Sequence, residues 1–491
     1  MHTLIVFGEE DVSWAPVFPV VLDFYRNQSN EVRILDVSEF SYPKFKSPPK
    51  WVLRKYGLKS SSSSLEEVKK RHALRTLRYV RLKQNELEPL SAGEWAEIDS
   101  SVEGLLMTLF ADYRPQRHRV LYPALKKRAE HGARLLFHTS LEVMLRDRPE
   151  RIVIPNGRFP YQKALVLASR RLGIEVSFYE RGFRTDTGVF VGGHMTVDRG
   201  AWQRMARDHN ERFDENTRRA SRQWLVARRV PGSLENEFSS NWKPDSQETE
   251  SAQTSRSKHP VAFFTSSQDE FLSLEDWQGF GWRDQYEAFV EFAKRVEGPY
   301  VLRIHPNFIN KSFGHALEET RRVFWMRKNV PELKIVWPTS PLSSYELIER
   351  AEKIVVHGST IGLEASAQGK PVWNSGSSMY DINADVRNFL PNKGYVDGFF
   401  QGWEVDPSRA EAIVDAQILA DIPIPKSLVQ RRWNAQTIPL AVRLLNLLYS
   451  GFGFYLVVLV ERSISKRLNK ALVSISSMVT DKWKSSSSTS Q

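Results

Sequence analysis

Small polar residues stand beside a histidine in the segment His357-Gly358-Ser359-Thr360, between an apolar strand-like run and a helix-like stretch. Such a turn exposes free backbone N–H groups, which bind anions. Gly358 would let a diphosphate approach the backbone, and the hydroxyls of Ser359 and Thr360 would add donors. Glu364 follows on the same helix, where its carboxylate would accept a ribose hydroxyl. The alternative is that Ser359 or Thr360 only caps the helix and that Glu364 is solvated.

Arg303 and His305 stand at the end of another apolar run, residues 300–304. Open α/β sheets bind ligands beyond the carboxyl ends of their strands. Pro306 fixes this turn, because a residue before proline favours extended backbone. We therefore expect Arg303 and His305 to contact a phosphate or a nucleobase. The alternative for His305 is a structural histidine whose hydrogen bonds are satisfied within the protein.

Hydroxyl residues also follow the apolar run 261–264, which we expect to be the first strand of the second half of the chain. Thr265 and Ser266 would then lie at the same sheet edge and contribute to phosphate binding. Asp269 and Glu270 come just after them, and residues of this type more often only cap the next helix.

In the first half, two expected strands end in polar residues, at Asn156 and Arg158 and at Glu180 and Arg181. A carboxylate beside such groups can take the proton of an attacking hydroxyl, while cations stabilise a departing phosphate. Glu180 is therefore a candidate catalytic base, with Asp198 as a second candidate. Asn156, Arg158 and Arg181 are candidates for binding the acceptor. The alternative is an internal ion pair between Glu180 and an arginine that holds two loops together.

Both halves alternate short apolar runs with helix-like stretches, which is typical of a parallel, doubly wound sheet. Three basic stretches, residues 71–83, 114–151 and 204–229, also have helical composition. The expected strands are residues 4–7, 32–37, 151–155, 174–179, 261–264, 300–304, 333–337, 353–356 and 371–373. The expected helices between them are residues 161–172, 284–296, 312–327, 343–351 and 360–368.

Composition divides the chain into parts. Residues 231–259 are rich in Ser, Asn, Gln and charge, without apolar periodicity, so we expect a linker there. It would join an acceptor domain, residues 1–230, to a donor domain, residues 260–430, both of them Rossmann-like and facing a cleft. Residues 431–491 would form an apolar and basic helical tail with a disordered end.

Charge and composition exclude several classes of function. The 491 residues include no Cys, so disulfides and thiolate chemistry are ruled out, which fits a cytoplasmic location. The first residues, MHTLIVFG, lack the features of a secretory signal. The net charge of +11 suits an acidic partner, but no nucleic-acid-binding motif is present. Patterns for a Walker A loop, HExxH, GxSxG, GxGxxG or an Asp-x-Asp metal site are also missing.

These motifs together resemble those of the bacterial capsular polysaccharide biosynthesis glycosyltransferases, a group that includes the capsular Kdo transferases. The resemblance spans roughly residues 152–380, although the Gly-Trp-Gly ending of the Kdo branch is missing after Pro371. The segments that carry it are Asn156-Gly157-Arg158, Gly173-Ile174, Glu180-Arg181-Gly182, Thr265-Ser266-Ser267, Asp269-Glu270-Phe271, Arg303-Ile304-His305-Pro306-Asn307, His357-Gly358-Ser359-Thr360 with Gly362 and Glu364-Ala365, and Gly369-Lys370-Pro371-Val372.

The resemblance implies a metal-independent GT-B glycosyltransferase without a cofactor, whose donor is a nucleotide-sugar bound by the second domain. The acceptor would be a growing polysaccharide or a lipid-linked glycan. By position, His305, Ser359, Thr360 and Glu364 match the donor-binding motifs. Two alternatives stay open, because a fold does not determine a function. One is a non-catalytic subunit of capsule assembly or export, and the other is a phosphotransferase or nucleotide-sugar epimerase on the same fold.

The tail contains an uncharged apolar run, residues 444–460, followed by Arg462, Lys466, Arg467 and Lys470. One interpretation is a monotopic anchor with a basic flank, which would make the enzyme peripheral on the inner face of the cytoplasmic membrane. The other is a buried helix that packs across the two domains. A membrane-spanning helix is disfavoured by Asn446, Gly451 and Gly453.

Overall fold

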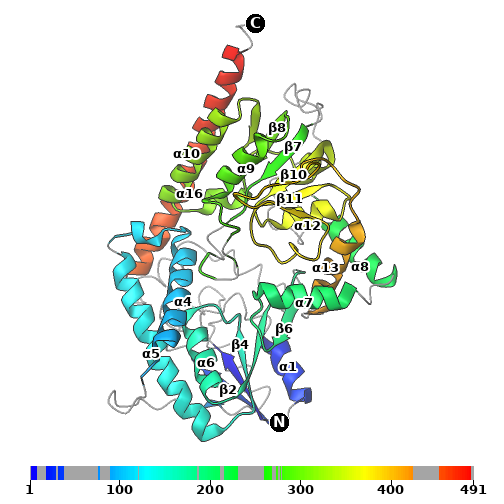
Figure 1. Cartoon of the computed structure of the whole chain (residues 1–491). Coiled ribbons are helices and arrows are strands. Elements are labelled where there is room, and N and C mark those ends of the chain that lie inside the picture. Colours follow the sequence, from blue (N-terminus) through cyan, green and yellow to red (C-terminus); the bar gives the residue numbers. More distant parts are fainter. Residues whose placement is uncertain are drawn as a thin grey trace, which may run out of the picture. The chain divides into compact units, whose positions relative to one another are not determined.

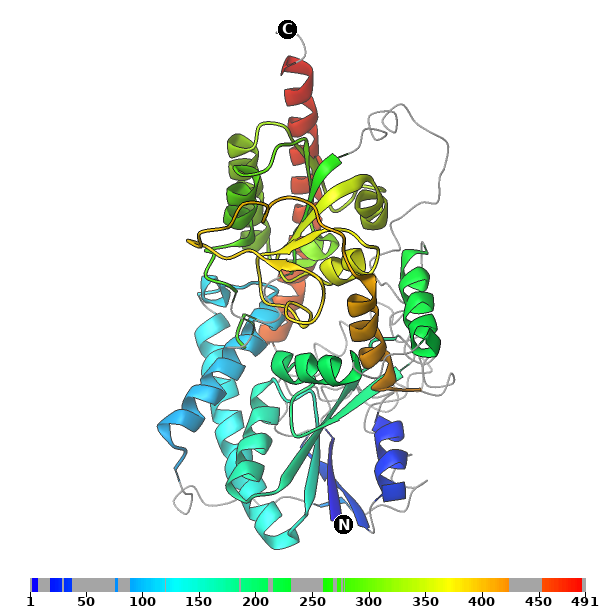
Figure 2. The ribbon, with the colours of Figure 1, turned by 45° about the vertical axis from the view of Figure 1, so that its right-hand side comes forward.

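The computed structural model describes residues 2–7, 18–28, 31–37, 76–77, 89–119, 121–184, 187–210, 215–230, 259–267, 272–274, 277, 279–423 and 453–487 (Figures 1 and 2). The chain forms two compact units. Unit 1 consists of Met1–Leu109, Pro115–Asp198 and Ile418–Val460. Unit 2 consists of Phe110–Arg114, Arg199–Gln417 and Glu461–Gln491.

In unit 1, the described strands form a seven-stranded sheet in the order β13-β6-β5-β4-β1-β2-β3. The strands from β3 to β5 pair in parallel, in the order of a Rossmann sheet, whereas β6 and β13 add antiparallel pairs at one edge. The strands are β1 (His2–Phe7), β2 (Glu31–Asp36), β3 (Thr76–Leu77), β4 (Arg151–Pro155), β5 (Glu175–Arg181), β6 (Thr187–Gly192) and β13 (Asp421–Pro423).

Helices cover both faces of this sheet: α1 (Phe18–Gln28) lies on one side, and α6 (Pro160–Arg171) lies on the other with α5 (Leu121–Asp147) behind it (Figures 1 and 2). Apolar residues of α1 pack with those of β1, β2, β4 and β5 in one buried cluster. The short helix η3 (Pro115–Arg117) precedes α5. The double covering explains why the central strands read as continuous apolar runs in the sequence.

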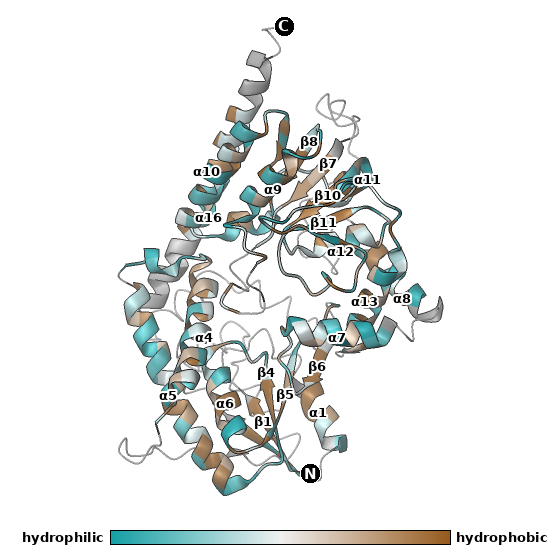
Figure 3. Cartoon of the chain, in the orientation of Figure 1, coloured by the Kyte–Doolittle hydropathy of each residue, from teal (hydrophilic) through white to brown (hydrophobic). Residues whose placement is uncertain are grey.

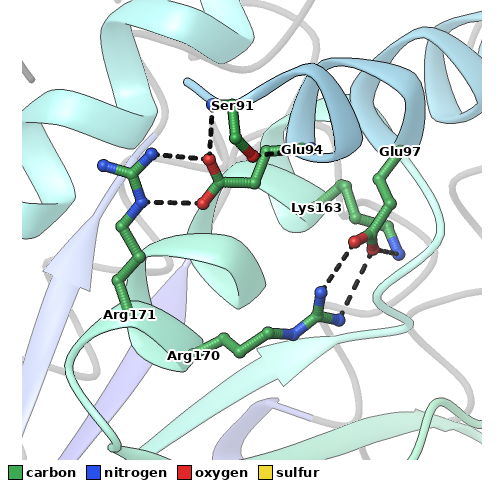
Figure 4. Close-up of polar contacts among 6 residues, drawn as sticks. All are labelled: Ser91, Glu94, Glu97, Lys163, Arg170 and Arg171. Carbon is green, nitrogen blue, oxygen red and sulfur yellow. Dashed lines mark hydrogen bonds and ion pairs between the residues drawn. The ribbon is translucent and has the colours of Figure 1, made fainter. Parts of the chain in front are cut away.

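Ion pairs attach α4 (Ala92–Phe110) to α6, as Figure 4 shows. The guanidinium of Arg171 donates to both carboxylate oxygens of Glu94, from Nε at 2.7 Å and from a terminal nitrogen at 2.5 Å. These bonds lower the pKa of Glu94 to about 2. Glu94 and Ser91 also bond reciprocally through their backbone and side chains, which is a capping box at the start of α4.

In unit 2, the described strands form a six-stranded sheet in the order β12-β11-β10-β7-β8-β9, and all pairs are parallel. Numbered from the first strand of the unit, this is the Rossmann order 3-2-1-4-5-6. The strands are β7 (His259–Phe264), β8 (Tyr300–Arg303), β9 (Leu333–Val336), β10 (Ala351–Val356), β11 (Val372–Asn374) and β12 (Arg387–Asn388).

Successive residues of β7 face opposite helix layers. Val261 and Phe263 pack with residues of α9 and α10, whereas Ala262 and Phe264 pack with residues of α11 and α12. The helices of this unit are α7 (Arg199–Asn210), α8 (Glu215–Arg229), α9 (Gln285–Ala293), η8 (Pro306–Asn310), α10 (Phe313–Asn329), α11 (Ser344–Arg350), α12 (Thr360–Ser366), α13 (Pro407–Leu419) and, from Glu461 onward, α16 (Gly453–Ser487). The expected α/β class with two doubly wound, Rossmann-like sheets is therefore confirmed.

Three details differ from the sequence-based expectations. Helices α7 and α8 group with unit 2 instead of the first half of the chain, and β13 returns to the sheet of unit 1. The expected helix over residues 71–83 is wrong at Thr76–Leu77, which pair with β2 as a strand. Residues 231–258 of the expected linker and residues 444–452 of the apolar run lie outside the described residues. None of the helices, as far as the chain is described, is long and apolar enough to cross a membrane.

Candidate functional site

The carboxyl ends of β7, β8 and β10 lie at one edge of the unit 2 sheet, where the chain winds away from β7 in both directions. This is the topological switch point, at which doubly wound sheets bind their ligands. The segments that leave the strands here begin at Thr265, His305 and His357. The structure thus brings the expected donor-binding segments to one place, although it engages several of their polar groups internally.

Thr265 connects the exits of β7 and β8. Its N–H donates to the carbonyl of Arg303 at 3.1 Å, and its hydroxyl accepts the N–H of His305 at 2.8 Å. Thr265 is buried, so its hydroxyl positions His305 and does not lie on the surface. Ser266 is half-buried, and its N–H donates to the side chain of Gln285 at 2.8 Å. Asp269 and Glu270 lie outside the described residues.

His305 caps the short helix η8. Its Nδ1 accepts the N–H of Asn307 at 3.1 Å, so the proton of the neutral ring is on Nε2. The ring is half-buried. Nearby, Lys311 Nζ and Asn307 Nδ2 donate to the hydroxyl of Ser267 at 2.5 and 3.4 Å. Lys311 is buried, so its ammonium and the amide of Asn307 join the segment after β8 to the segment after β7.

Arg303 is a buried cation. Only 3% of its surface is exposed, and one terminal nitrogen donates to the carbonyl of Trp337 at 2.9 Å. No carboxylate of the described residues pairs with it, and burial lowers its pKa to about 10. The guanidinium therefore stays charged at neutral pH although it is buried. Its positive field at the strand ends favours a bound anion even without direct contact.

His357 has the opposite tautomer. Its Nδ1 lies 3.1 Å from the hydroxyl of Ser375, which itself donates to the carbonyl of Val356 at 3.0 Å. Because that hydroxyl has a single proton, Nδ1 of His357 is the donor and Nε2 is the acceptor. Burial lowers the pKa of His357 to about 4, against the opposing charge of Asp284. The imidazole is therefore neutral at physiological pH.

Gly358 is required by the loop that packs on it. Its φ is +71°, and an added Cβ would lie 2.4 Å from the carbonyl oxygen of Ser377. Its N–H donates to the side chain of Asn374 at 2.9 Å. This corrects the expectation that the N–H of Gly358 is available to a diphosphate: the loop after β11 occupies the position in which we expected the ligand.

Ser359 and Thr360 differ in role. Ser359 caps α12, because its hydroxyl accepts the N–H of Ile361 at 3.4 Å, and it is buried. For Ser359, the capping interpretation of the sequence is therefore the one that the structure shows. Thr360 is exposed at the first position of the helix. Only Thr360 of this pair presents its hydroxyl to solvent.

The structure corrects the expectation for Glu364. It is 2% exposed, and one carboxylate oxygen accepts from Nε and a terminal nitrogen of Arg228 at 3.2 and 3.1 Å. The other oxygen accepts the hydroxyl of Tyr345. Burial and the Glu364 carboxylate both raise the pKa of Tyr345, so its phenol stays protonated. With these partners Glu364 forms an internal ion pair that joins α8 to α12, and it does not present a carboxylate to a ribose.

The residues that sequence reasoning missed are at the end of β11 and in the loop after it. Asn374 accepts the N–H of Gly358, and Ser375 sets the tautomer of His357. Asp381 accepts from Arg199 at 2.7 Å and from Gln203 at 2.6 Å, which attaches α7 to this loop. The Asn-Ser-Gly-Ser-Ser run after a strand was a signal for a structured turn.

In unit 1, Glu180 and Asn156 meet at the carboxyl ends of β5 and β4. Oε2 of Glu180 accepts from the amide of Asn156 at 2.8 Å and from the hydroxyl of Thr196. Burial raises the pKa of Glu180 above its usual value, although these donors, Arg158 and Arg181 oppose the shift. Glu180 is thus a carboxylate held by uncharged donors, with a raised affinity for a proton.

The other unit 1 candidates surround this carboxylate or lie further along the chain. Asn156 has a φ of +51°, and its side chain also accepts the N–H of Arg158 at 3.1 Å, so it shapes the turn. The guanidinium of Arg158 lies over the ring of Phe159 at 4.8 Å, and Arg181 is exposed. Asp198 lies in the turn before α7, where its N–H donates to the carbonyl of Met195 at 3.0 Å.

No group of three or more His, Cys, Asp or Glu residues suited to a metal ion occurs in the described part of the chain. No family model matches the chain, and no curated protein matches its sequence. Solved structures do resemble it. The Thermosulfurimonas dismutans KpsC β-Kdo 2,7 transferase is 14% identical, with 61% of this chain and 90% of that chain covered at a TM-score of 0.37.

Epimerases are similar to a comparable degree. The UDP-GlcNAc 2-epimerase of Methanocaldococcus jannaschii is 14% identical, with 85% of this chain and 99% of that chain covered at a TM-score of 0.28. The Staphylococcus aureus MnaA in a UDP co-structure is 12% identical, with 84% and 91% covered at a TM-score of 0.26. Similarity at this level does not identify a reaction.

Proposed function

We propose that the protein is a glycosyltransferase that moves a sugar from a nucleotide-sugar to a hydroxyl of a glycan acceptor. The observation that carries this proposal is the Glu180 carboxylate, which is oriented by Asn156 and Thr196 and has a raised pKa. A general base needs a fixed geometry and a pKa nearer to neutrality than that of an exposed carboxylate. Glu180 has both features, and it lies at the carboxyl ends of parallel strands, where such sheets bind ligands.

In this mechanism Glu180 accepts the proton of the acceptor hydroxyl while the oxygen attacks the anomeric carbon. The bond from that carbon to the donor phosphate breaks, and the nucleotide leaves with the electron pair. Nε2–H of His305 is a donor for the phosphate oxygens, and the buried charges of Arg303 and Lys311 add a favourable field. Solvent then takes the proton from Glu180.

The residues with roles in this mechanism lie in motifs of the first and second halves of the chain that resemble those of the capsular polysaccharide glycosyltransferases. Asn156, Arg158 and Arg181 surround the proposed base and would hold the acceptor, for which we propose a capsular or lipid-linked glycan. Asp198, the other base candidate, has no role in this mechanism. The proposed mechanism uses no metal ion, because cationic side chains stabilise the negative charge of the leaving phosphate.

The test is sugar transfer and nucleotide binding by the full chain. We expect one of CMP, UDP, GDP, dTDP or ADP to raise the melting temperature, since a ligand at about 100 times its Kd adds roughly 2.7 kcal/mol to stability. His305→Ala should abolish that shift. Glu180→Gln should keep the shift and lower the transfer rate by about 10²–10⁴-fold.

Each possible result has a distinct meaning. A Glu180→Gln variant that transfers sugar at the wild-type rate would remove Glu180 as the base. No response to any nucleotide would favour a non-catalytic subunit of polysaccharide assembly. A protein that interconverts the free nucleotide-sugar without an acceptor would be an epimerase, and the proposal would then be wrong.

A further inference from the structure

Helix α16 packs on unit 2 through small and polar side chains. Nδ2 of Asn469 donates to the carbonyl of Lys311 at 2.8 Å, and the N–H of Phe313 donates to the hydroxyl of Ser465 at 3.2 Å. The residues of this packed face are Ser465, Asn469, Val473, Ser476 and Thr480, each of which is at most 5% exposed. Their spacing of three or four residues places them on one side of the helix.

The apolar side chains of α16 lie on a different side and are exposed. Among the described residues, thirteen large hydrophobic side chains are exposed, and five of these belong to this helix. They are Ile464, Leu468, Ile475, Met478 and Val479, at 52%, 43%, 55%, 56% and 45% exposure. Figure 3 shows hydrophobic and hydrophilic residues interspersed along the coloured part of α16. We refer to these five residues as the outer apolar face.

Basic residues lie beside this face. Lys466, Arg467 and Lys470 are exposed, and residues 463–480 contain no Asp or Glu. At 100° per residue, these three side chains occupy the sector of the helix between the packed face and the outer apolar face. The helix therefore has one face packed on its own unit, one apolar face and one cationic face.

We propose that the outer apolar face and the three basic residues of α16 bind the surface of an anionic lipid bilayer. An interfacial helix buries its apolar side at the boundary between headgroups and acyl chains, while cationic side chains contact anionic headgroups. A lipid surface offers acyl chains to the apolar face and anionic headgroups to the cationic face at the same time. A second copy of the same helix would instead place like charges together. This inference does not depend on the reaction proposed above.

The packed face explains why the arrangement suits a surface and not a span. Asn469 and Ser465 fix α16 to unit 2 by hydrogen bonds, so the whole unit would approach the lipid with the helix lying on it. The uncharged run at residues 444–460 lies before the described side chains of α16, which begin at Ser463. The test must therefore separate the outer apolar face from that run.

The experiment measures sedimentation of the full chain with vesicles of phosphatidylcholine, with or without phosphatidylglycerol. We expect binding to the anionic vesicles that weakens with added salt. The triple variant Lys466→Gln, Arg467→Gln, Lys470→Gln should bind about a hundredfold more weakly, since each basic residue near an anionic surface contributes about 1 kcal/mol. The double variant Ile464→Gln, Ile475→Gln should lose about tenfold or more per residue.

The matched control is Ile382→Gln, Val396→Gln, which changes two apolar residues of unit 2 that are 55% and 80% exposed but lie outside α16. This variant should bind vesicles like the wild type. All variants change exposed side chains, so their melting temperatures should match that of the wild type. Unchanged binding by the Ile464 and Ile475 variant would overturn the proposal, because residues 444–460 would then be responsible. The proposal would also be overturned if the wild-type protein bound no vesicles and formed a dimer that the Ile464 and Ile475 variant dissociates.

Discussion

Two glutamates, one in each unit, have opposite surroundings. Glu180 is the penultimate residue of β5 in unit 1 and accepts hydrogen bonds from the uncharged Asn156 and Thr196. Glu364 lies on α12, after β10 in unit 2, and accepts both a guanidinium and a phenol. The first carboxylate can exchange a proton, whereas the second is half of a buried ion pair.

The partners of a carboxylate, and not its place beside a strand end, thus separate a reactive group from a structural one. Burial lowers the pKa of an arginine, but the Glu364 carboxylate more than offsets this at Arg228, whose pKa is raised. At Glu180 burial outweighs the opposing groups, and the pKa of the carboxyl is raised. Three measurements can break or sharpen this contrast.

The largest expected effect is on stability in unit 2. Arg228→Met would leave Glu364 buried without its cation, which costs about 3–5 kcal/mol of unfolding free energy. Lys294→Met is the control, because Lys294 also belongs to unit 2 and pairs with Glu291 at 2.5 Å, with 59% and 29% of the two side chains exposed. The control should lose about 1 kcal/mol or less. Equal losses in urea denaturation would show that the Glu364 pair is no more structural than an exposed one.

The next effect is the pH dependence that His357 imposes on unit 2. Its folded pKa of about 4 lies below the usual value of 6.5, so the folded state resists protonation. Its contribution to stability is full above pH 6.5 and is lost as the pH falls toward 4, by about 3 kcal/mol in all. His357→Gln should flatten this part of the curve of unfolding free energy against pH. An unchanged slope would show that the ring is not buried neutral.

The smallest effect concerns the folded stability of unit 1. Because the pKa of Glu180 is raised on folding, the folded state binds its proton more tightly than the unfolded chain. The stabilising contribution is present below the usual carboxyl pKa and is lost as the pH rises through the folded pKa. Glu180→Gln should therefore gain stability relative to the wild type at neutral pH, but not at acidic pH. A loss at neutral pH would make Glu180 a structural group like Glu364.

Local signals in the sequence predicted the elements of both sheets well. Ser343 precedes an apolar helical pattern, and it is the N-cap of α11. The expected strand over residues 151–155 has the bounds of β4, because a short apolar run between polar turns has few alternatives. Strand exits such as those at Asn156 and His305 were also predictable, since polar residues follow directly upon the runs.

Contacts between distant segments could not be predicted in the same way. Arg228 and Glu364 are 136 residues apart, and nothing in either segment specifies the other. Thr196 contacts Glu180 from the segment that follows β6, a strand whose antiparallel pairing with β5 the sequence did not reveal. Likewise, Gly358 predicted that another group lies close to its backbone. The sequence did not reveal that this group is the carbonyl of Ser377 and not a phosphate.

The route of the chain has a practical consequence for dissecting the protein. Each unit is completed by a segment from elsewhere in the sequence: β13 closes the sheet of unit 1, where Asp421 accepts the hydroxyl of Thr187 at 2.7 Å, and α8 supplies Arg228 to unit 2. A cut at residue 230 would separate Glu364 from Arg228 and strand β6 from strand β13. The two halves therefore require coexpression or a permuted chain to fold, and proteolysis between them would not release two intact units.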